Sequence, residues 1–267
     1  MVTATSHRRT SLLPIADGAL EYLLTGKGAP TTVFGHGLAG SIDTTRPFGS
    51  AVAGTRAFFH FRGHGASSSP ETPWTYAALA AELRAVADAV DATQALGVSM
   101  GAGALCHALE ETPDRFDRIV LVIPAILDTP RTDQALDRLL QMGELAHDHD
   151  VDGVFDLMLR AQPAPMRDRP EVRTWCRRQA ETIVRTDVGR ALRTIPHEVA
   201  MTGRDALRGI PAPLLVLAQE DDPAHPVWVA EQIAALVPDA TLEVLPPGGI
   251  LWSHRSTVRH LIGEFLS

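Results

Sequence analysis

The sequence contains little of what marks several large classes of protein. Only two of its 267 residues are cysteines, Cys106 and Cys176, and they lie far apart without a CxxC pair or a Cys/His spacing typical of a metal site. Lys27 is its only lysine, and the chain has neither a G-x-x-x-x-G-K-[ST] loop nor a G-x-G-x-x-G after a first strand. We therefore expect no metal and no cofactor.

Charge and hydropathy exclude further classes. The 32 acidic residues outnumber the 24 basic ones, the formal net charge is −8, and no Lys/Arg-rich stripe reverses this balance, which argues against a nucleic-acid partner. No apolar stretch approaches the length of a membrane span, and Met1–Ser11 lacks the apolar run of a signal peptide. We expect a cytoplasmic protein that acts on a small molecule, away from membranes. Its oligomeric state stays open.

Short apolar strands alternate with helices in two separate parts of the chain. The strands are predicted at Thr31–Phe34, Arg56–Phe61, Thr93–Val98, Arg118–Ile123, Pro213–Ala218 and Thr241–Leu245. Between about Asp133 and Arg204 only helical patterns occur. The pattern predicts an α/β fold: a mostly parallel sheet with flanking helices, formed by residues 1–125 and 206–267. Residues 126–205 are predicted to be a helical cap insertion, with an ordinary helical packing layer as the alternative.

A candidate nucleophile lies between a predicted strand and a predicted helix. Residues 97–101 read Gly-Val-Ser-Met-Gly, which fits the pattern G-x-S-x-G. A serine on such a sharp turn has a strained backbone, and the flanking glycines leave room for it. The hydroxyl of Ser99 is then lifted above the sheet, and the backbone N–H of Met100, at a helix N-terminus, can face a developing oxyanion.

These motifs resemble those of the α/β-hydrolase family over nearly the whole chain. His36-Gly37-Leu38 after a strand is similar to that family's oxyanion loop, which assigns a second oxyanion N–H to Leu38. The segment from Arg62 to Gly65 resembles the loop after the next strand, although His60 stands where the family commonly has aspartate. The helical insertion after Ile123 matches the family's cap position.

The resemblance also orders the remaining catalytic residues as serine, acid, histidine. Asp222, just after the strand Pro213–Ala218, matches the acid, and Asp221 is the second candidate. The histidine departs from the pattern, because the expected place after the last strand holds Gly249 and Ile250. His254 is the nearest candidate base and reaches Ser99 only if the loop folds back. Otherwise it begins the last helix in solvent.

The leading hypothesis is a serine hydrolase acting on a small, mostly apolar ester, lactone or related acyl compound. In it Ser99 attacks the carbonyl, Leu38 and Met100 hold the oxyanion, and Asp222 with a histidine transfers the proton. His36 and His60 are further candidates to border the site. Two alternatives stay open: a cofactor-free lyase, cyclase or isomerase, and a ligand-binding pseudoenzyme with a degenerate triad.

Overall fold

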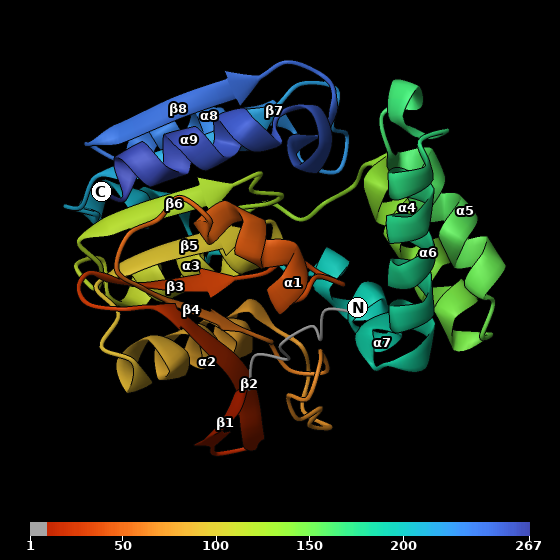
Figure 1. The fold of residues 1–267 in the computed structure, drawn as a ribbon, viewed down its shortest axis with the longest axis horizontal. Coiled ribbons are helices and arrows are strands. Elements are labelled where there is room, and N and C mark those ends of the chain that lie inside the picture. Colours follow the sequence, from red (N-terminus) through yellow and green to blue (C-terminus); the bar gives the residue numbers. More distant parts are fainter. Residues whose placement is uncertain (1–9) are drawn as a thin grey trace, which may run out of the picture.

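A computed structural model describes residues 10–267, so most of the N-terminal segment predicted to lack a signal peptide lies outside the described residues. Within these residues, eight strands form one sheet in the order β1-β2-β4-β3-β5-β6-β7-β8 (Figure 1). Their bounds are β1 Ser11–Ile15, β2 Gly18–Gly26, β3 Thr31–Gly35, β4 Thr55–Phe59, β5 Gln94–Val98, β6 Arg118–Val122, β7 Leu214–Gln219 and β8 Ala240–Leu245. The pairs β1–β2 and β2–β4 are antiparallel and all others are parallel.

Helices cover both faces of this sheet. The helices are α1 Ile42–Thr45, α2 Tyr76–Ala89, α3 Met100–Glu111, α4 Gln134–His147, α5 Val151–Ala161, α6 Pro170–Arg185, α7 Val188–Thr194, α8 Val227–Leu236 and α9 Arg255–Phe265. Apolar side chains of α2, α3 and α8 form the core on one face, and those of α1 and α9 form the core on the other. Of the helices within residues 10–267, none has the length and apolar character needed to cross a membrane.

The central strands are apolar because helices bury both of their faces. All six residues of β7 are buried, and four of the five residues in β5 and in β6 are buried as well. A parallel strand covered on both sides carries a near-continuous apolar run instead of an alternating one. The predicted α/β fold is therefore confirmed, with strand ends that differ from the predicted ones by a few residues.

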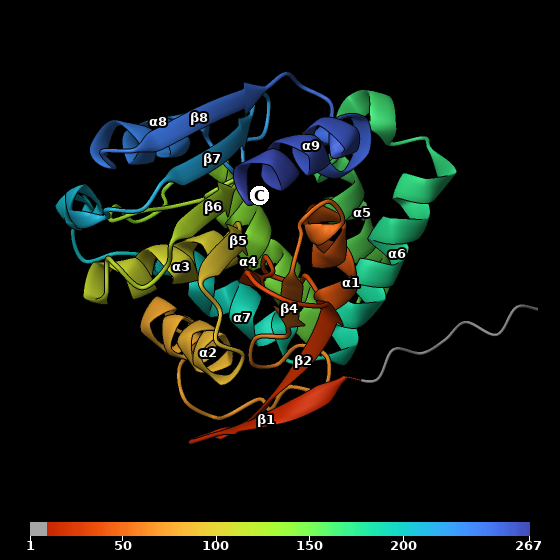
Figure 2. The ribbon, with the colours of Figure 1, turned by 60° about the vertical axis from the view of Figure 1, so that its left-hand side comes forward.

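Helices α4 to α7 form a group of their own, inserted in the chain between β6 and β7. Figure 1 shows this group beside the sheet, on the side toward which the arrows of β6 and β8 point, and Figure 2 shows it from another direction. The group has its own apolar core, which includes Val154, Val172, Cys176 and Ile183. The carboxylates of Asp133 and Asp150 cap the first two helices. The division at 126 and 205 stays a prediction.

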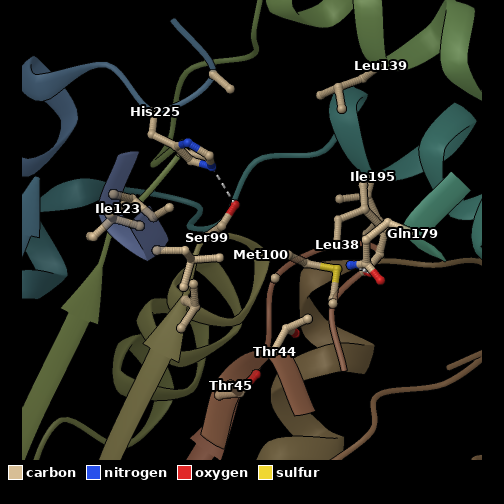
Figure 3. Close-up of a pocket in the computed structure, with 18 of the residues that line it drawn as sticks. Leu38, Thr44, Thr45, Ser99, Met100, Ile123, Leu139, Gln179, Ile195 and His225 are labelled. Carbon is tan, nitrogen blue, oxygen red and sulfur yellow. Dashed lines mark hydrogen bonds between the residues drawn. The ribbon is translucent and has the colours of Figure 1, made fainter. Parts of the chain in front are cut away.

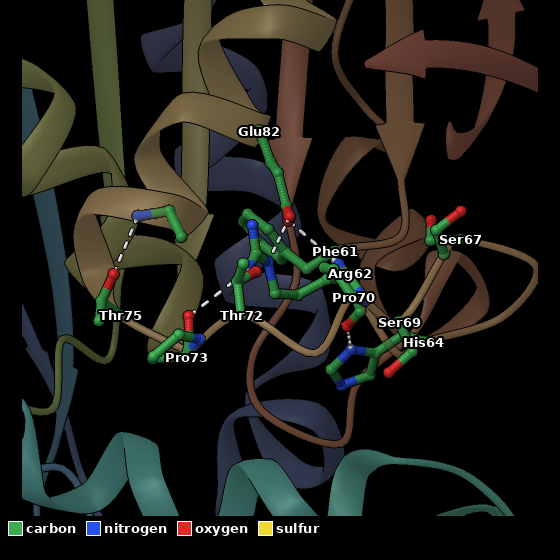
Figure 4. Close-up of polar contacts among 12 residues, drawn as sticks. Phe61, Arg62, His64, Ser67, Ser69, Pro70, Thr72, Pro73, Thr75 and Glu82 are labelled. Carbon is green, nitrogen blue, oxygen red and sulfur yellow. Dashed lines mark hydrogen bonds and ion pairs between the residues drawn. The ribbon is translucent and has the colours of Figure 1, made fainter. Parts of the chain in front are cut away.

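A buried ion pair anchors the loop that follows β4 (Figure 4). Arg62 donates through its Nε to Glu82 of α2 at 2.5 Å, and its backbone N–H donates to the same carboxylate at 3.0 Å. The side chains of Arg62 and Glu82 are only 5% and 3% exposed. The guanidinium also donates to Thr72 and to the carbonyl of Pro73, just ahead of α2. The pair therefore joins the loop to the start of that helix.

Candidate active site

Ser99 lies on a strained turn between β5 and α3. Its φ is 51° and its ψ is −109°, a backbone conformation rare for a residue with a side chain. The turn is closed by its backbone N–H, which donates to Val122 of β6 at 2.9 Å. Close packing of α3 on the sheet needs glycine at 101, because a Cβ there would lie 2.5 Å from the carbonyl oxygen of Gly35.

The partner of the Ser99 hydroxyl is His225, on the loop between β7 and α8. The distance from Ser99 Oγ to His225 Nε2 is 2.9 Å (Figure 3). On the other side of the ring, Nδ1 lies 2.8 Å from Asp222 Oδ2. An ionised carboxylate only accepts hydrogen bonds, so Nδ1 carries the proton and the bare Nε2 accepts from the serine hydroxyl. Serine, histidine and aspartate are thus aligned in one hydrogen-bonded chain.

The loop itself holds Asp222 ionised. Burial raises the pKa of this carboxyl, but the neighbouring His225 and the hydrogen bonds from His225 and Ala224 outweigh that effect, so the pKa of Asp222 lies below its ordinary value. The backbone N–H of Ala224 donates to Oδ1 at 3.1 Å. Pro223 and Pro226 each fix one φ angle, which limits the freedom of the loop.

A second contact fixes this loop from outside. Arg131, in the segment between β6 and α4, donates through Nη2 to the carbonyl of Ala224 at 2.6 Å and to the carbonyl of Ala125 at 2.8 Å. The residue that precedes His225 is thereby tied to the segment that leads into α4. This contact opposes movement of the histidine away from Ser99.

His254 is not brought to Ser99, so its candidacy as the catalytic base is wrong, and of the two outcomes left open the loop does not fold back to deliver it. Its Nε2 lies 3.4 Å from the carbonyl of Pro247, and it begins α9 on the partly exposed side of the helix. The preceding residues, Gly249–Ser253, form a π-helical turn. Ile250, at the position expected for a histidine, lines the cavity in front of Ser99 instead.

His36 and His60 are buried behind the site and do not border its cavity, contrary to the expectation for them. Burial holds the pKa of both rings below the ordinary value. His36 donates from Nδ1 to Gly37 at 2.7 Å and accepts from Phe61 at 3.0 Å. His60 faces Glu21 at 2.8 Å and accepts from Ile42 at 3.0 Å. Both nitrogens of each ring are occupied in joining loops, so neither ring is available to a substrate.

Leu38 and Met100 do lie at the cavity beside Ser99 (Figure 3). Met100 is the first residue of α3, whose first N–H groups have no acceptor within the helix. The loop that carries Leu38 packs directly on Ser99, because a Cβ added to Gly37 would lie 3.3 Å from the Cβ of Ser99. The structure therefore brings together Ser99, Asp222, Leu38 and Met100 among the predicted residues.

The cavity has a volume of about 270 Å³ and a mostly apolar wall. Leu139, Met158 and Trp175 reach it from α4, α5 and α6, opposite the ends of the strands. Within residues 10–267, no group of three or more His, Cys, Asp or Glu side chains is arranged to hold a metal ion. The polar side chains of the wall are Thr44, Thr45, Tyr76, Ser99, Arg131, Gln179 and His225.

His225 is the site residue that sequence reasoning missed. The signal was present, since it follows Asp222 by three residues, in a loop already singled out for its acid. The search for the base followed chain order and looked only beyond the last strand. A search for histidines on any loop at the carboxyl edge of the sheet would have included it.

Comparison with known proteins places this geometry in a family. The family model described as alpha/beta hydrolase fold matches residues 30–250. No curated protein sequence matches the chain. Three similar solved structures show the same fold. An esterase from Exiguobacterium antarcticum is 19% identical, with a TM-score of 0.74 over 97% of this chain and 100% of that one.

The second, an enol-lactonase from Burkholderia xenovorans, is 18% identical, with a TM-score of 0.76 over 96% of this chain and 99% of that one. The third, an alpha/beta hydrolase enzyme from a Medee basin deep-sea metagenome library, is 16% identical, with a TM-score of 0.77 over 96% of each chain. The family match covers most of the sequence and agrees with the observed sheet and turn. The chain therefore belongs to the alpha/beta hydrolase fold family and is a hydrolase-type enzyme.

Proposed function

We propose that this enzyme is a serine hydrolase that cleaves small, mostly apolar esters or lactones through an acyl-enzyme on Ser99. The observation that carries the proposal is the hydrogen-bonded chain of 2.9 Å from Ser99 to His225 and 2.8 Å from His225 to Asp222. A serine hydroxyl is a weak nucleophile unless a base takes its proton during attack, and this chain provides one.

In the first half of the reaction, Ser99 Oγ attacks the carbonyl carbon while its proton passes to His225 Nε2. The carbonyl oxygen becomes an oxyanion, held by the backbone N–H groups of Met100 and Leu38. Asp222 stabilises the imidazolium that forms, without itself taking the proton. His225 then gives its proton to the departing alcohol oxygen, and the acyl group stays on Ser99.

In the second half, water replaces the alcohol. His225 Nε2 takes a proton from the water, the hydroxide oxygen bonds to the acyl carbon, and the bond to Ser99 Oγ breaks. The proton returns to Ser99, and the carboxylic acid leaves. For a lactone the same steps open the ring, because the leaving alcohol is part of the acyl group.

The cavity supports the choice of substrate. Its volume of about 270 Å³ lies just below the usual range for ligand pockets, roughly 300–1,000 Å³, which favours a small substrate. Its wall is mainly apolar, which favours a short hydrocarbon chain. The names of two similar structures, an esterase and an enol-lactonase, are consistent with an ester or lactone substrate here. We further propose that α4 to α7 act as a cap over this cavity.

The test is labelling with a fluorophosphonate followed by hydrolysis of short p-nitrophenyl esters. We expect rapid modification of the wild-type protein at Ser99, and we expect neither labelling nor turnover in a folded Ser99→Ala variant. The non-hydrolytic and ligand-binding alternatives predict an unreactive serine in the wild-type protein. Turnover at the wild-type level in Ser99→Ala would place the chemistry on another residue.

A further inference from the structure

Several polar side chains in the cavity wall take no part in the proposed proton transfer, and two of them are of interest for substrate binding. One is the guanidinium of Arg131 and the other is the phenol of Tyr76, the first residue of α2. The side chain of Arg131 is 6% exposed and Tyr76 as a whole is 4% exposed. Both are buried in the protein and line the same apolar cavity as Ser99.

The charge of Arg131 is incompletely neutralised. Its nearest carboxylate, that of Asp133, lies 3.8 Å from Nε, beyond hydrogen-bond distance, and already accepts from two backbone N–H groups of α4. Nη2 donates to two carbonyls, whereas Nη1 has no acceptor among residues 10–267. Buried charges in proteins are normally paired, so a guanidinium in this state is suited to an anionic ligand.

Tyr76 adds a second donor without a partner. Its hydroxyl has no hydrogen-bond partner within residues 10–267, and its oxygen is not fully enclosed by protein atoms, so it can face the cavity that Tyr76 lines. Burial raises the pKa of Tyr76, and the nearby positive charge of Arg131 opposes this only in part, so the phenol stays protonated. It is therefore available to donate to an oxygen that Arg131 attracts.

We propose that Arg131 and Tyr76 form a subsite for a carboxylate at the far end of the substrate's acyl group. A carboxylate has two oxygens, one to accept from the free Nη1 and one to accept from the phenol. We place this carboxylate on the acyl part of the substrate, because Arg131 and Tyr76 are shielded from solvent. The leaving alcohol, in contrast, has to depart into solvent. The inference rests on the proposed function and narrows its substrates to half-esters and to lactones that carry an acidic chain.

The first experiment compares two substrates that differ in this group. One is the mono-p-nitrophenyl ester of glutaric acid, and the other is p-nitrophenyl pentanoate, which is neutral and has a chain of the same length. We expect the wild-type protein to hydrolyse the acidic ester with the higher kcat/KM. Arg131→Met should lower the ratio of the two kcat/KM values by about tenfold to a hundredfold, as for a charged hydrogen bond. Tyr76→Phe should lower it by roughly threefold to tenfold.

The ratio separates substrate recognition from a structural role. Arg131 also holds the carbonyl of Ala224, so its loss is expected to slow both substrates, and an equal loss on both would overturn the proposal. A wild-type preference for the neutral ester would overturn it as well. Arg208→Met is the matched control, because Arg208 is 62% exposed and pairs with Asp205 away from the cavity. It removes the same charge and should leave the ratio unchanged.

A binding measurement keeps the subsite testable without turnover or a folded Arg131 variant. In Ser99→Ala, monomethyl glutarate should bind at least about tenfold more tightly than dimethyl glutarate by calorimetry, and Tyr76→Phe in that background should reduce this difference. Equal affinities would refute the subsite even if Ser99 proves to be the nucleophile. Selective binding in a protein that hydrolyses nothing would refute the proposed function and leave the subsite intact.

Discussion

Replacement of His225 by alanine tests the proposed mechanism most directly. The imidazole is the hydrogen-bond partner of the Ser99 hydroxyl at 2.9 Å, and no other side chain within residues 10–267 makes a hydrogen bond to that oxygen. The variant therefore loses its general base without a substitute at hand. Loss of a triad member elsewhere lowers kcat by about 10⁴-fold to 10⁶-fold. We expect a fall of at least about a thousandfold here, or roughly 4 kcal/mol in the activation barrier.

The assay is the steady-state hydrolysis of p-nitrophenyl butyrate, with the rate of fluorophosphonate labelling as a second measure. Both rates should fall together, since both need an activated Ser99. The side chain of His225 is 18% exposed and lies on a loop, so the melting temperature should change little. His254→Ala is the matched control, a histidine removed from the partly exposed start of α9, and should keep turnover within about twofold of wild type.

Two results would refute the reasoning. One is a folded His225→Ala protein that keeps more than a tenth of the wild-type turnover. The other is a collapse of turnover in His254→Ala, which would mean that the loop after β8 delivers the base in solution.

Three further predictions concern the acid, a buried ion pair and the proposed cap. Asp222→Asn should lower turnover by about a thousandfold or more. At acidic pH, the free energy of unfolding of this variant should change less with pH than that of the wild-type protein. The reason is that the pKa of Asp222 lies below the ordinary 3.8 in the folded protein, so ionised Asp222 stabilises the fold above that pH. This contribution disappears as the pH falls through the folded-state pKa. An acid unfolding curve that is the same in variant and wild type would contradict this prediction. Glu82→Ala should destabilise the fold by about 3–5 kcal/mol in urea titration, because it leaves the buried Arg62 unpaired. In hydrogen exchange, α4 to α7 should exchange faster than β5 to β7, and equal protection would count against a mobile cap.

The fold could be predicted because its signals are local and repeated. The strands β5 and β7 are near-continuous apolar runs, and the turn at Ser99 carries small residues where the helix meets the sheet. Each of these features is visible in a short stretch of sequence, although the contacts that require it come from elsewhere in the chain, as those of Gly101 with Gly35 do. The alternation of strands and helices then predicts a mostly parallel sheet, but not the order of its strands.

The histidines could not be assigned in the same way, because their roles depend on tertiary placement. His36 and His225 both follow a strand at the same edge of the sheet. Asp222, three residues before His225, marks that loop, but the sequence does not show which of the two rings faces Ser99. The ring of His36 is enclosed between two loops that occupy both of its nitrogens, whereas that of His225 faces Ser99. Only the packing of neighbouring loops distinguishes a structural imidazole from one with a free nitrogen.

The three-residue spacing of Asp222 and His225 has a consequence for the segment after β8. Since acid and base lie on one short loop, in which Pro223 directly follows the acid and Pro226 directly follows the base, their mutual alignment is a local property, independent of the last turn of the fold. The turn after β8 therefore does not have to supply a catalytic histidine, and its side chains can make other contacts. Ile250 lines the cavity, and Trp252 donates to Gln162 near the end of α5 at 2.9 Å. Substitutions in this turn can therefore change the cavity wall, or the contact between the sheet domain and helices α4 to α7, without changing the hydrogen bonds among Ser99, His225 and Asp222.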